Sequence, residues 1–504
     1  MLLADVVATS TTVAATRSRR AKVTAIADLL GRLEREDTEL AAVVASYLGG
    51  SLRQRRTGLG WRGLESLPAP AGEPSLTVAD VHRRFDDISA LAGAGSGAKR
   101  SAAVADLFGR ATADEQRWLR GVVTGELRQG ALDALVQDAA AAVAGVPGAD
   151  VRRAAMLAGS TVEAVVAALH GGAAELSGFG LHVGRPLLPM LASSATSVAE
   201  AVGGLTGEVA VDTKLDGIRI QVHRGSDGIR IATRTLDDIT ARLPEVVEIV
   251  RALPAQEFVL DGEALALADD GRPKAFQDTA ARTAQASGTV VTPFFFDVLH
   301  LDGVDLLDVP LRERLAVLDG FVPERHRVPR LVTEDPVAAS EFAEDAVAAG
   351  HEGVVVKDLD SRYAAGRRGG AWVKVKPVHT LDLVVLAVER GSGRRAGWLS
   401  NIHLGARDPE SGGFVMLGKT FKGMTDEILT WQTARFRELQ TEDRGHVVTV
   451  RPEQVVEVAF DGLQRSTRYP GGVALRFARV VRYREDKTAE EADTVETVLA
   501  LARS

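Results

Sequence analysis

The sequence predicts three domains: a helical first third, a middle region of mixed strands and helices, and a β-rich last quarter. Length is the first reason, because 504 residues exceed the roughly 250–300 that one hydrophobic core serves. Periodicity is the second. Segments such as VTAIADLLGRLERED and GALDALVQDAAAAVAGV repeat apolar residues at helical spacing, whereas later segments alternate apolar and polar residues. The third is GRPLLPMLAS (184–193), whose prolines exclude a helix at the first boundary.

The first two regions are predicted element by element. Residues 1–184 are helical, with a loop at the Gly- and Ala-rich stretch AGAGSGAK (92–99). In residues 185–378, strands are predicted at EVAVDTK, IRIQVHR, DGIRIATR, TVVTPFFFDVL and HEGVVVKDL. Short turns between these strands favour antiparallel pairing.

The last region, residues 379–504, is predicted to be a small closed barrel. Strands are expected at LDLVVLAVER, GFVMLGKTF, VVEVAFDG and LRFARVVRYR, with one helix near 425–440. Closely spaced strands of this kind suit a barrel, and the oligonucleotide-binding (OB) fold is one candidate.

Composition excludes several classes of function. The chain has no cysteine, which removes disulfides, thiolate nucleophiles and cysteine-based zinc sites. No apolar run approaches the ~20 residues of a membrane span, and Asp5 stands where a signal peptide carries positive charge. We therefore expect a cytoplasmic protein without a membrane partner.

The net charge is −8, yet basic clusters such as RQRR (53–56) are candidates for phosphate contacts. Solvated helix faces are the alternative interpretation of these clusters.

Lysine is the rare basic residue, with ten lysines against fifty arginines. Arginine is effectively never deprotonated, whereas lysine can become a nucleophile or meet phosphate as a compact charge. A lysine retained in such a chain is therefore a candidate for chemistry. In VDTKLDGIRIQVHR (211–224), Lys214 ends one predicted strand, and Leu-Asp-Gly separates it from the next. The alternative is a hairpin turn with a surface salt bridge of ~0–1 kcal/mol.

Six further motifs follow Lys214 along the chain. In one of them, Lys374 and Lys376 lie two residues apart on a predicted strand, so both face one side, where they can hold a phosphate. Each motif alone is compatible with an ordinary turn or core strand, but six in order are much less readily explained by chance. The motifs are ATRTLDDIT, VLDGEALA, FFFDVLHLDG, HEGVVVKD, WVKVKP and LRFARVVRYREDK.

In these motifs and their order, the chain resembles the ATP-dependent DNA ligases of the covalent nucleotidyltransferase superfamily over nearly its full length. KLDGIR is similar to the nucleophile motif, and GELRQGALDALVQDA (125–139) to the N-terminal DNA-binding domain. The resemblance implies an all-α DNA-binding domain (1–184), an α+β, ATP-grasp-like nucleotidyltransferase domain (185–378) and an OB-fold β-barrel (379–504). It also implies a monomer that acts on nicked double-stranded DNA with ATP and Mg²⁺ or Mn²⁺, at the nucleoid of a bacterial cytoplasm.

The family's reaction implies roles for particular residues. Neutral Lys214 attacks the α-phosphate of ATP, AMP then passes to the 5′-phosphate of the nick, and the 3′-hydroxyl expels AMP. Lys374 and Lys376 assist this chemistry, and Glu352 and Glu263 hold the metal. Nucleotide contacts are expected from Asp212, Arg219, Arg234, Glu263, Phe296, Arg368 and Lys374. Pyrophosphate is oriented by Arg476, Arg479, Asp486 and Lys487. DNA is contacted by Phe276, Phe477, Arg53, Arg55 and Arg56, with core packing as the alternative for the two phenylalanines.

Two positions depart from the family pattern. Relatives often carry glutamate where this chain has Asp212, and proline where it has Ala478. An RNA ligase or a capping-type nucleotidyltransferase shares the lysine motif but does not typically carry the long helical N-terminus. NAD-dependent ligases carry a four-cysteine zinc module, which this chain cannot form. A non-catalytic nucleic-acid-binding relative would keep the fold and form no AMP adduct.

Overall fold

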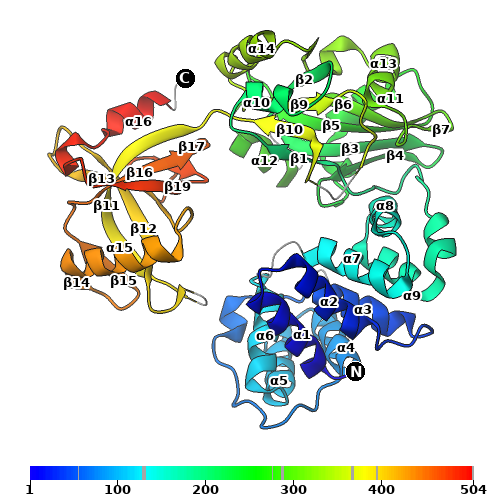
Figure 1. Cartoon of the computed structure of the whole chain (residues 1–504), viewed down its shortest axis with the longest axis horizontal. Helices are drawn as coiled ribbons and strands as arrows, with labels where there is room; N and C mark the ends of the chain where they lie inside the picture. Colours follow the sequence, from blue (N-terminus) through cyan, green and yellow to red (C-terminus); the bar gives the residue numbers. More distant parts are fainter. Residues whose placement is uncertain are drawn as a thin grey trace.

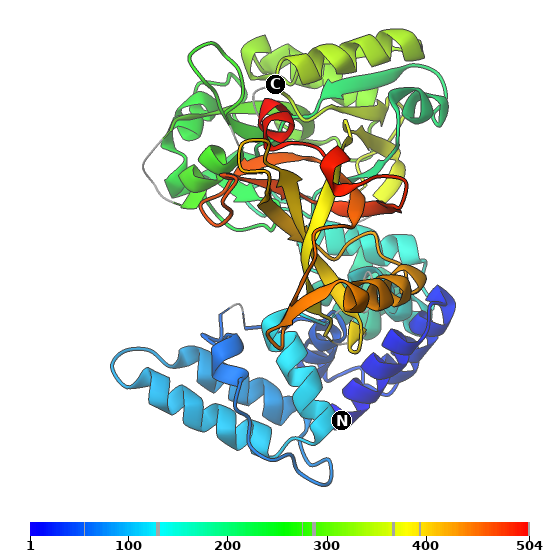
Figure 2. The same cartoon turned by 90° about the vertical axis from the view of Figure 1, so that its left-hand side faces the viewer.

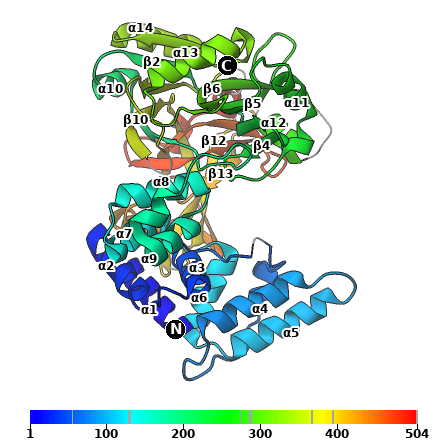
Figure 3. The ribbon, with the colours of Figure 1, turned by 90° about the vertical axis from the view of Figure 1, so that its right-hand side faces the viewer.

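The computed structural model describes residues 1–54, 56–127, 132–274, 276–284, 289–364, 368–392 and 395–501, with the backbone alone at residues 62, 283–284 and 368–369. It has three parts: a helical N-terminal region, a middle region and a β-rich C-terminal region (Figure 1). Seen from the two sides, the N-terminal and middle regions lie at opposite ends, and the C-terminal region lies against one flank (Figures 2 and 3). None of the helices in the described ranges is long and apolar enough to cross a bilayer.

The N-terminal region contains helices and, among its described residues, no strand, as the helical spacing predicts. Its helices pack around one apolar core, in which Tyr47, Phe85 and Phe108 are completely buried. The helices are α1 (Leu3–Ala15), α2 (Arg19–Leu30), α3 (Thr38–Leu48), η1 (Trp61–Leu64), α4 (Val78–Ala90), α5 (Ser96–Gly109), α6 (Ala113–Thr124), α7 (Leu132–Ala144), α8 (Gly148–Ala158) and α9 (Thr161–Ser177).

The predicted loop at residues 92–99 is only partly correct, because α5 already begins at Ser96. Gly95 precedes it with φ of 78°, a left-handed conformation that glycine adopts at low cost. Beyond that turn, Ala98 and Lys99 are good helix formers. Glycine content therefore located the turn but overestimated its length.

The middle region is built from two five-stranded sheets. The first has the order β1-β10-β9-β2-β8 and the second β4-β3-β5-β6-β7; all pairs are antiparallel except β1 with β10. The strands are β1 (Leu191–Ser194), β2 (Val209–Thr213), β3 (Ile218–Gly225), β4 (Gly228–Thr233), β5 (Phe258–Ala266), β6 (Val291–Leu301), β7 (Val304–Asp305), β8 (Arg330–Thr333), β9 (Val354–Asp358) and β10 (Arg368–Val375). The helices are α10 (Val198–Gly203), η2 (Thr240–Arg242), α11 (Pro244–Arg251), α12 (Phe276–Ala284), α13 (Leu311–Phe321), η3 (Glu324–His326) and α14 (Pro336–Ala348).

The six strands predicted in this region, including the one at WVKVKP, are confirmed as β2, β3, β4, β6, β9 and β10, although Lys376 lies one residue beyond the end of β10. β6 also carries a charge into the core beside α13. Asp297 and Arg314 are both 0% exposed and form a bidentate pair at 2.8 and 2.9 Å. Arg314 donates further to the carbonyls of Val309 and Ser361. This full set of partners lets two charges remain inside the protein.

The C-terminal region is a curled sheet, with α15 and α16 packed against it. β11 pairs with β16 along its first half and with β12 and β15 along its second. Thr420, at the end of β13, donates to the carbonyl of Ala478, and the Val480 N–H donates to that of Lys422, so the edges of the sheet meet. The elements are β11 (His379–Arg390), β12 (Leu399–Arg407), β13 (Phe414–Thr420), α15 (Asp426–Glu438), β14 (Gln440–Asp443), β15 (Val447–Val450), β16 (Val455–Phe460), β17 (Gly462–Arg465), β18 (Val473–Arg476), β19 (Arg479–Arg484), η5 (Ala489–Glu491) and α16 (Val495–Leu501).

Two differences from the predicted C-terminal strands have clear causes. LRFARVVRYR is two strands rather than one, because Phe477 has φ of 55° and interrupts the extended backbone between β18 and β19. β12 was not predicted, since Asn401, His403 and Gly405 weaken its strand pattern. The helix expected near 425–440 is confirmed as α15.

We predict that Arg314→Met destabilises the middle region by about 3–5 kcal/mol, because it leaves the Asp297 carboxylate buried without its partner. The double variant Arg314→Met/Asp297→Asn should recover part of this loss. Urea denaturation of the three proteins gives the comparison. Equal stability of the single variant and the wild type would show that the pair is not needed.

Candidate active site

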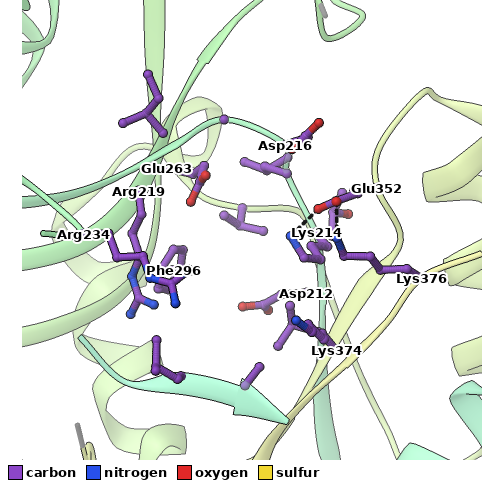
Figure 4. A pocket seen from close by; sticks show the side chains of 18 of the residues that line it. Asp212, Lys214, Asp216, Arg219, Arg234, Glu263, Phe296, Glu352, Lys374 and Lys376 are labelled. Atoms are coloured by element: carbon purple, nitrogen blue, oxygen red, sulfur yellow. Dashed lines mark hydrogen bonds and ion pairs between the residues drawn. The ribbon is translucent and has the colours of Figure 1, made fainter. Parts of the chain in front are cut away.

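A cavity of about 560 Å³ lies between the two sheets of the middle region. Figure 4 shows side chains from both sheets pointing into it. The C-terminal region contributes two residues to its rim. Its lining includes Asp212, Lys214, Asp216, Arg219, Arg234, Glu263, Phe276, Phe296, Glu352, Lys357, Trp372, Lys374, Lys376, Arg476 and Phe477.

Lys214 lies where the chain crosses from one sheet to the other. β2 ends at Thr213 in the first sheet, and β3 begins at Ile218 in the second. The hairpin alternative is therefore wrong. Gly217 is required in this crossing, because a Cβ there would lie 2.3 Å from the carbonyl oxygen of Ala264.

The Glu352 carboxylate holds two ammonium groups in the cavity, those of Lys214 and Lys376 (Figure 4). The backbone supports the contact: the Lys214 N–H donates to the Gly353 carbonyl at 2.8 Å, and the Glu352 N–H donates to the Lys214 carbonyl at 3.0 Å. Burial raises the pKa of Glu352, but the two lysines outweigh this effect and hold the pKa below its ordinary value. Glu352 is therefore an anion fixed beside the candidate nucleophile.

Glu263, on β5, points its carboxyl group into the same cavity (Figure 4). Burial raises its pKa from 4.5 to about 7, against the opposing effect of Lys214 and Arg219. The neighbouring carboxylates of Asp261 and Asp216 add to the rise. The two cavity glutamates thus differ in protonation near neutral pH, because only Glu352 is directly paired with lysines.

Asp212 is engaged inside the protein rather than free in the cavity. Arg330, opposite it on β8, donates to its two oxygens at 2.5 and 3.2 Å. Lys357 Nζ lies 2.6 Å from Oδ2. Both Asp212 oxygens are therefore occupied, and the contact with an adenine amino group stays a prediction.

Lys357 lies between two aromatic rings that line the cavity. Its Nζ is 4.5 Å from the ring centroid of Phe296 and 4.3 Å from that of Trp372. The rings meet edge to face, with centroids 5.9 Å apart at 81°. Burial lowers the pKa of Lys357, although Asp212 opposes the change. Cation–π contact and the ion pair together hold the Phe296 ring in place.

Arg219 is fixed by partners on three sides. It binds Asp261 through two hydrogen bonds at 3.0 and 2.6 Å and donates to the Met190 carbonyl at 2.6 Å. Tyr363 donates to the same Asp261 carboxylate at 2.7 Å. The guanidinium carbon of Arg219 lies 5.5 Å from the centroid of the Phe296 ring. The arginine predicted to reach the nucleotide is thus held rigidly at the cavity wall.

The C-terminal region reaches the cavity through Arg476 and Phe477. Arg476 donates to Asp216 at 2.6 Å, and its guanidinium carbon lies 5.4 Å from the ring of Phe276 and 5.8 Å from that of Phe477. The two rings are 36% and 56% exposed. Core packing is therefore the wrong interpretation of these phenylalanines. The left-handed backbone of Phe477 is a strained conformation of the kind found at functional sites.

Three predicted pyrophosphate residues do not line the cavity. Arg479 pairs with Asp461 at 3.3 Å, and Lys487 pairs with Asp382 at 2.6 Å within the C-terminal region. Asp486 is bound by a neighbouring arginine on the same region. Their role in orienting pyrophosphate stays a prediction, because which face of the C-terminal region meets the cavity cannot be read from sequence.

The other predicted residues divide between the cavity and the N-terminal surface. Arg234 and Lys374 line the cavity. Arg53 is 37% exposed and pairs with a glutamate of α3 at 2.5 Å, and Arg56 is exposed. Two predicted residues lie outside what the structure describes: Arg55 and, for its side chain, Arg368.

Trp372, Lys357 and Arg330 contribute to the site, although no role for them was predicted from the sequence. Trp372 had a usable signal, because it lies two residues before Lys374 on β10 and must share its face. The sequence contained no such signal for Arg330. Its contact with Asp212 depends on the pairing of β2 with β8, and the two residues are 118 positions apart.

Comparison with known proteins places this site in a family. Residues 64–141, 189–376 and 395–487 match families described as DNA ligase N terminus, ATP dependent DNA ligase domain and ATP dependent DNA ligase C terminal region. A Kineococcus radiotolerans protein named "Probable DNA ligase" is 83% identical and covers 100% of both chains. A Nocardioides sp. protein of the same name is 70% identical over 99% of this chain and 98% of its own. The solved structure named Pmar-Lig_PreS3 shares the fold, with TM-score 0.63, 18% identity and coverage of 95% and 99%. The chain therefore belongs to the ATP-dependent DNA ligase family.

Proposed function

We propose that this chain seals nicks between 3′-hydroxyl and 5′-phosphate ends of duplex DNA through a covalent AMP intermediate on Lys214. The observation that carries the proposal is the position of the Lys214 amine in the cavity. It projects from the crossing between two sheets, beside a carboxylate that is shared with a second lysine. A partly buried, oriented amine among phosphate-binding cations is suited to attack a phosphorus atom.

The cavity offers a partner for each part of ATP. The Phe296 ring suits the adenine base. We expect Arg219 and Arg234 to contact the ribose and phosphates, and Lys374 and Lys376 to contact the α-phosphate, because all four line the cavity. These groups come from both sheets, so a bound nucleotide would bridge them.

Glu352 and Glu263 fit Mg²⁺, because carboxylates are the hard oxygen ligands that it prefers. Within the described ranges, no group of three or more His, Cys, Asp or Glu residues is placed to hold a metal. Mg²⁺ is commonly held by one or two carboxylates together with phosphate oxygens and water. When bound, it supplies neutralisation of phosphate charge.

The chain's own residues position and neutralise the reacting groups. Lys214 must lose a proton before it attacks, and Lys376 is the second donor that can keep Glu352 paired when this happens. The α-phosphate then forms a bond to Nζ while its bond to pyrophosphate breaks. AMP passes to the 5′-phosphate, and the 3′-hydroxyl displaces it. Such in-line transfers depend mainly on positioning and charge.

We assign residues 1–184 to DNA binding, 185–378 to nucleotidyl transfer and 379–504 to an OB-fold domain. The curled sheet whose edges meet supports the last assignment. We infer that the protein acts as a monomer in the bacterial cytoplasm, at the nucleoid, as the family resemblance implies.

The orientation of the C-terminal region suits the steps on DNA. The exposed rings of Phe276 and Phe477 lie together at the cavity rim, where apolar wedges can enter the minor groove beside a nick. Asp486 and Lys487 face their own region instead. Their role in orienting pyrophosphate therefore requires the C-terminal region to turn during the ATP step.

Incubation with ATP and Mg²⁺ should add one AMP to the wild type and none to Lys214→Arg, because arginine cannot become neutral. Intact-mass measurement reads the adduct directly. Lys99→Ala, an exposed lysine on α5, is the matched control and should be labelled like the wild type. An adduct on Lys214→Arg would contradict the proposal.

The raised pKa of Glu263 predicts a pH-dependent stability of the nucleotide-free protein. Between its ordinary pKa of 4.5 and about 7, the folded state holds a proton that the unfolded state has lost. Stability must therefore fall as the pH rises through this window. Glu263→Gln should not show this loss, so the difference in melting temperature, wild type minus variant, should decrease from pH 5 to about 8. A difference that stays constant with pH would refute the assignment.

Arg53→Glu/Arg56→Glu should weaken binding to nicked DNA. It should also make the slope of log K against log salt concentration less steep by about 2, because each lost phosphate contact contributes roughly 0.9. Titrations at several salt concentrations give this slope. Arg83→Glu/Arg84→Glu on α4, at two arginines that are 71% and 42% exposed, is the control with the same change of net charge. An unchanged slope would remove these arginines from the DNA-binding surface.

A further inference from the structure

The middle region is joined to its two neighbours in different ways. Met156 and Leu157 of α8 are buried in one apolar cluster with Leu187, Met190 and other side chains of the middle region. The bidentate pair between Arg153 and an aspartate before α13 adds to this junction. Separating these two regions would expose apolar surface to water, which is costly.

The junction with the C-terminal region is polar. Within the described ranges, none of the hydrophobic clusters combines residues of the middle and C-terminal regions. One stretch of chain between β10 and β11 links them (Figure 1), and Val378 within it is 51% exposed. Contact is made by ion pairs, hydrogen bonds and the guanidinium of Arg476 over the ring of Phe276, and water can replace the polar partners. The C-terminal region can therefore leave this position without exposing a core.

The β17–β18 hairpin makes several of the contacts at this junction, and a further ion pair joins Lys376 to Asp461, directly before β17, at 3.8 Å. The hairpin is a separate two-stranded sheet, with Arg465 at the turn end of β17 and Arg476 at the far end of β18. Arg465 pairs with Asp278 at 2.7 Å, and its carbonyl accepts from the Gln277 side chain at 3.1 Å. Both partners belong to the first turn of α12, which begins with Phe276. The hairpin thus holds the helix turn that carries one exposed ring.

The same hairpin ends next to the other ring. Arg476 is followed directly by Phe477, and its guanidinium lies within 6 Å of the rings of Phe276 and Phe477. The two phenylalanines come from different regions, so their spacing depends on how those regions dock. A fixed hairpin position fixes the spacing of both rings.

We propose that Arg465 is a positioning residue for nick sealing: its pair with Asp278 docks the hairpin on α12 and sets the two rings as one wedge for the minor groove. The inference rests on the proposed function. It assigns Arg465 no contact with the reacting atoms. Arg465 contacts the protein's own α12, and the two aligned rings enter the minor groove of duplex DNA.

The exposure of the pair fits a reversible contact. The side chains of Arg465 and Asp278 are 71% and 37% exposed. Ion pairs this exposed shift the equilibrium between the docked and undocked hairpin by up to about fivefold. A stronger contact would hold the C-terminal region in the orientation for DNA and hinder the ATP step. Loss of the pair should therefore slow sealing and leave the reaction with ATP intact.

A charge swap tests the pair. Arg465→Asp places two carboxylates together and should slow single-turnover sealing of a nick with a preformed 5′-AMP by about fivefold or more. Its rate of AMP-adduct formation with ATP should equal or exceed that of the wild type. Asp278→Arg should show the same sealing defect. The double variant Arg465→Asp/Asp278→Arg should restore sealing toward the wild-type rate, which a merely structural defect would not do.

Arg468→Asp is the matched control, because Arg468 is an exposed arginine in the turn of the same hairpin. It should seal like the wild type. Equal defects in Arg468→Asp and Arg465→Asp, or no rescue by the double variant, would overturn the proposal in favour of a direct charge effect on DNA. Failure of the wild type to form an AMP adduct would instead refute the proposed function. Normal adduct formation with unimpaired sealing by Arg465→Asp would refute the positioning role alone.

Discussion

The Glu352 carboxylate, shared by Lys214 and Lys376, is the interaction on which the organisation of the middle region depends. The three residues lie beside the ends of β2, β9 and β10, neighbouring strands of one sheet. Two cations beside one anion leave a net positive charge in a partly closed cavity, which favours a polyphosphate ligand. The crossing at Gly217 then brings in the second sheet, whose aromatic and guanidinium groups complete the cavity.

Buried charges around the cavity are paired inside the protein before any ligand arrives. Asp212 is held by Arg330 and Lys357, and the Arg219 guanidinium is held by Asp261. Such pairs add little net stability compared with apolar packing, but breaking one is costly, so they restrict side chains to one arrangement. This preorganisation is what a phosphoryl-transfer site requires. These pairs also explain why the Asp212 carboxylate, although two residues from the candidate nucleophile, is bound to Arg330 and Lys357 in the cavity wall.

Period-two patterns and ordered motifs predicted most strands of the middle region. They also predicted that Lys214, Glu352 and Lys376 belong to one site. They could not predict contacts that depend on long-range pairing, such as Arg330 with Asp212, because strand partners are chosen by the whole sheet. Nor could they predict the break at Phe477, where a bulky residue adopts φ of 55°. They also did not predict that Asp486 and Lys487 pair within the C-terminal region and do not line the cavity, because sequence contains no signal for which face of a docked region meets the cavity.

In the proposed reaction, Lys214 forms a bond to AMP and has no covalent role after AMP reaches DNA. Single-turnover ligation by Lys214→Ala tests it most directly, with two substrates compared: an ordinary nick with ATP, and a nick that already carries 5′-linked AMP. We expect no sealing of the first substrate and sealing of the second, with a melting temperature that shows the variant is folded. Sealing of the ordinary nick, or loss of both reactions by a folded variant, would contradict it.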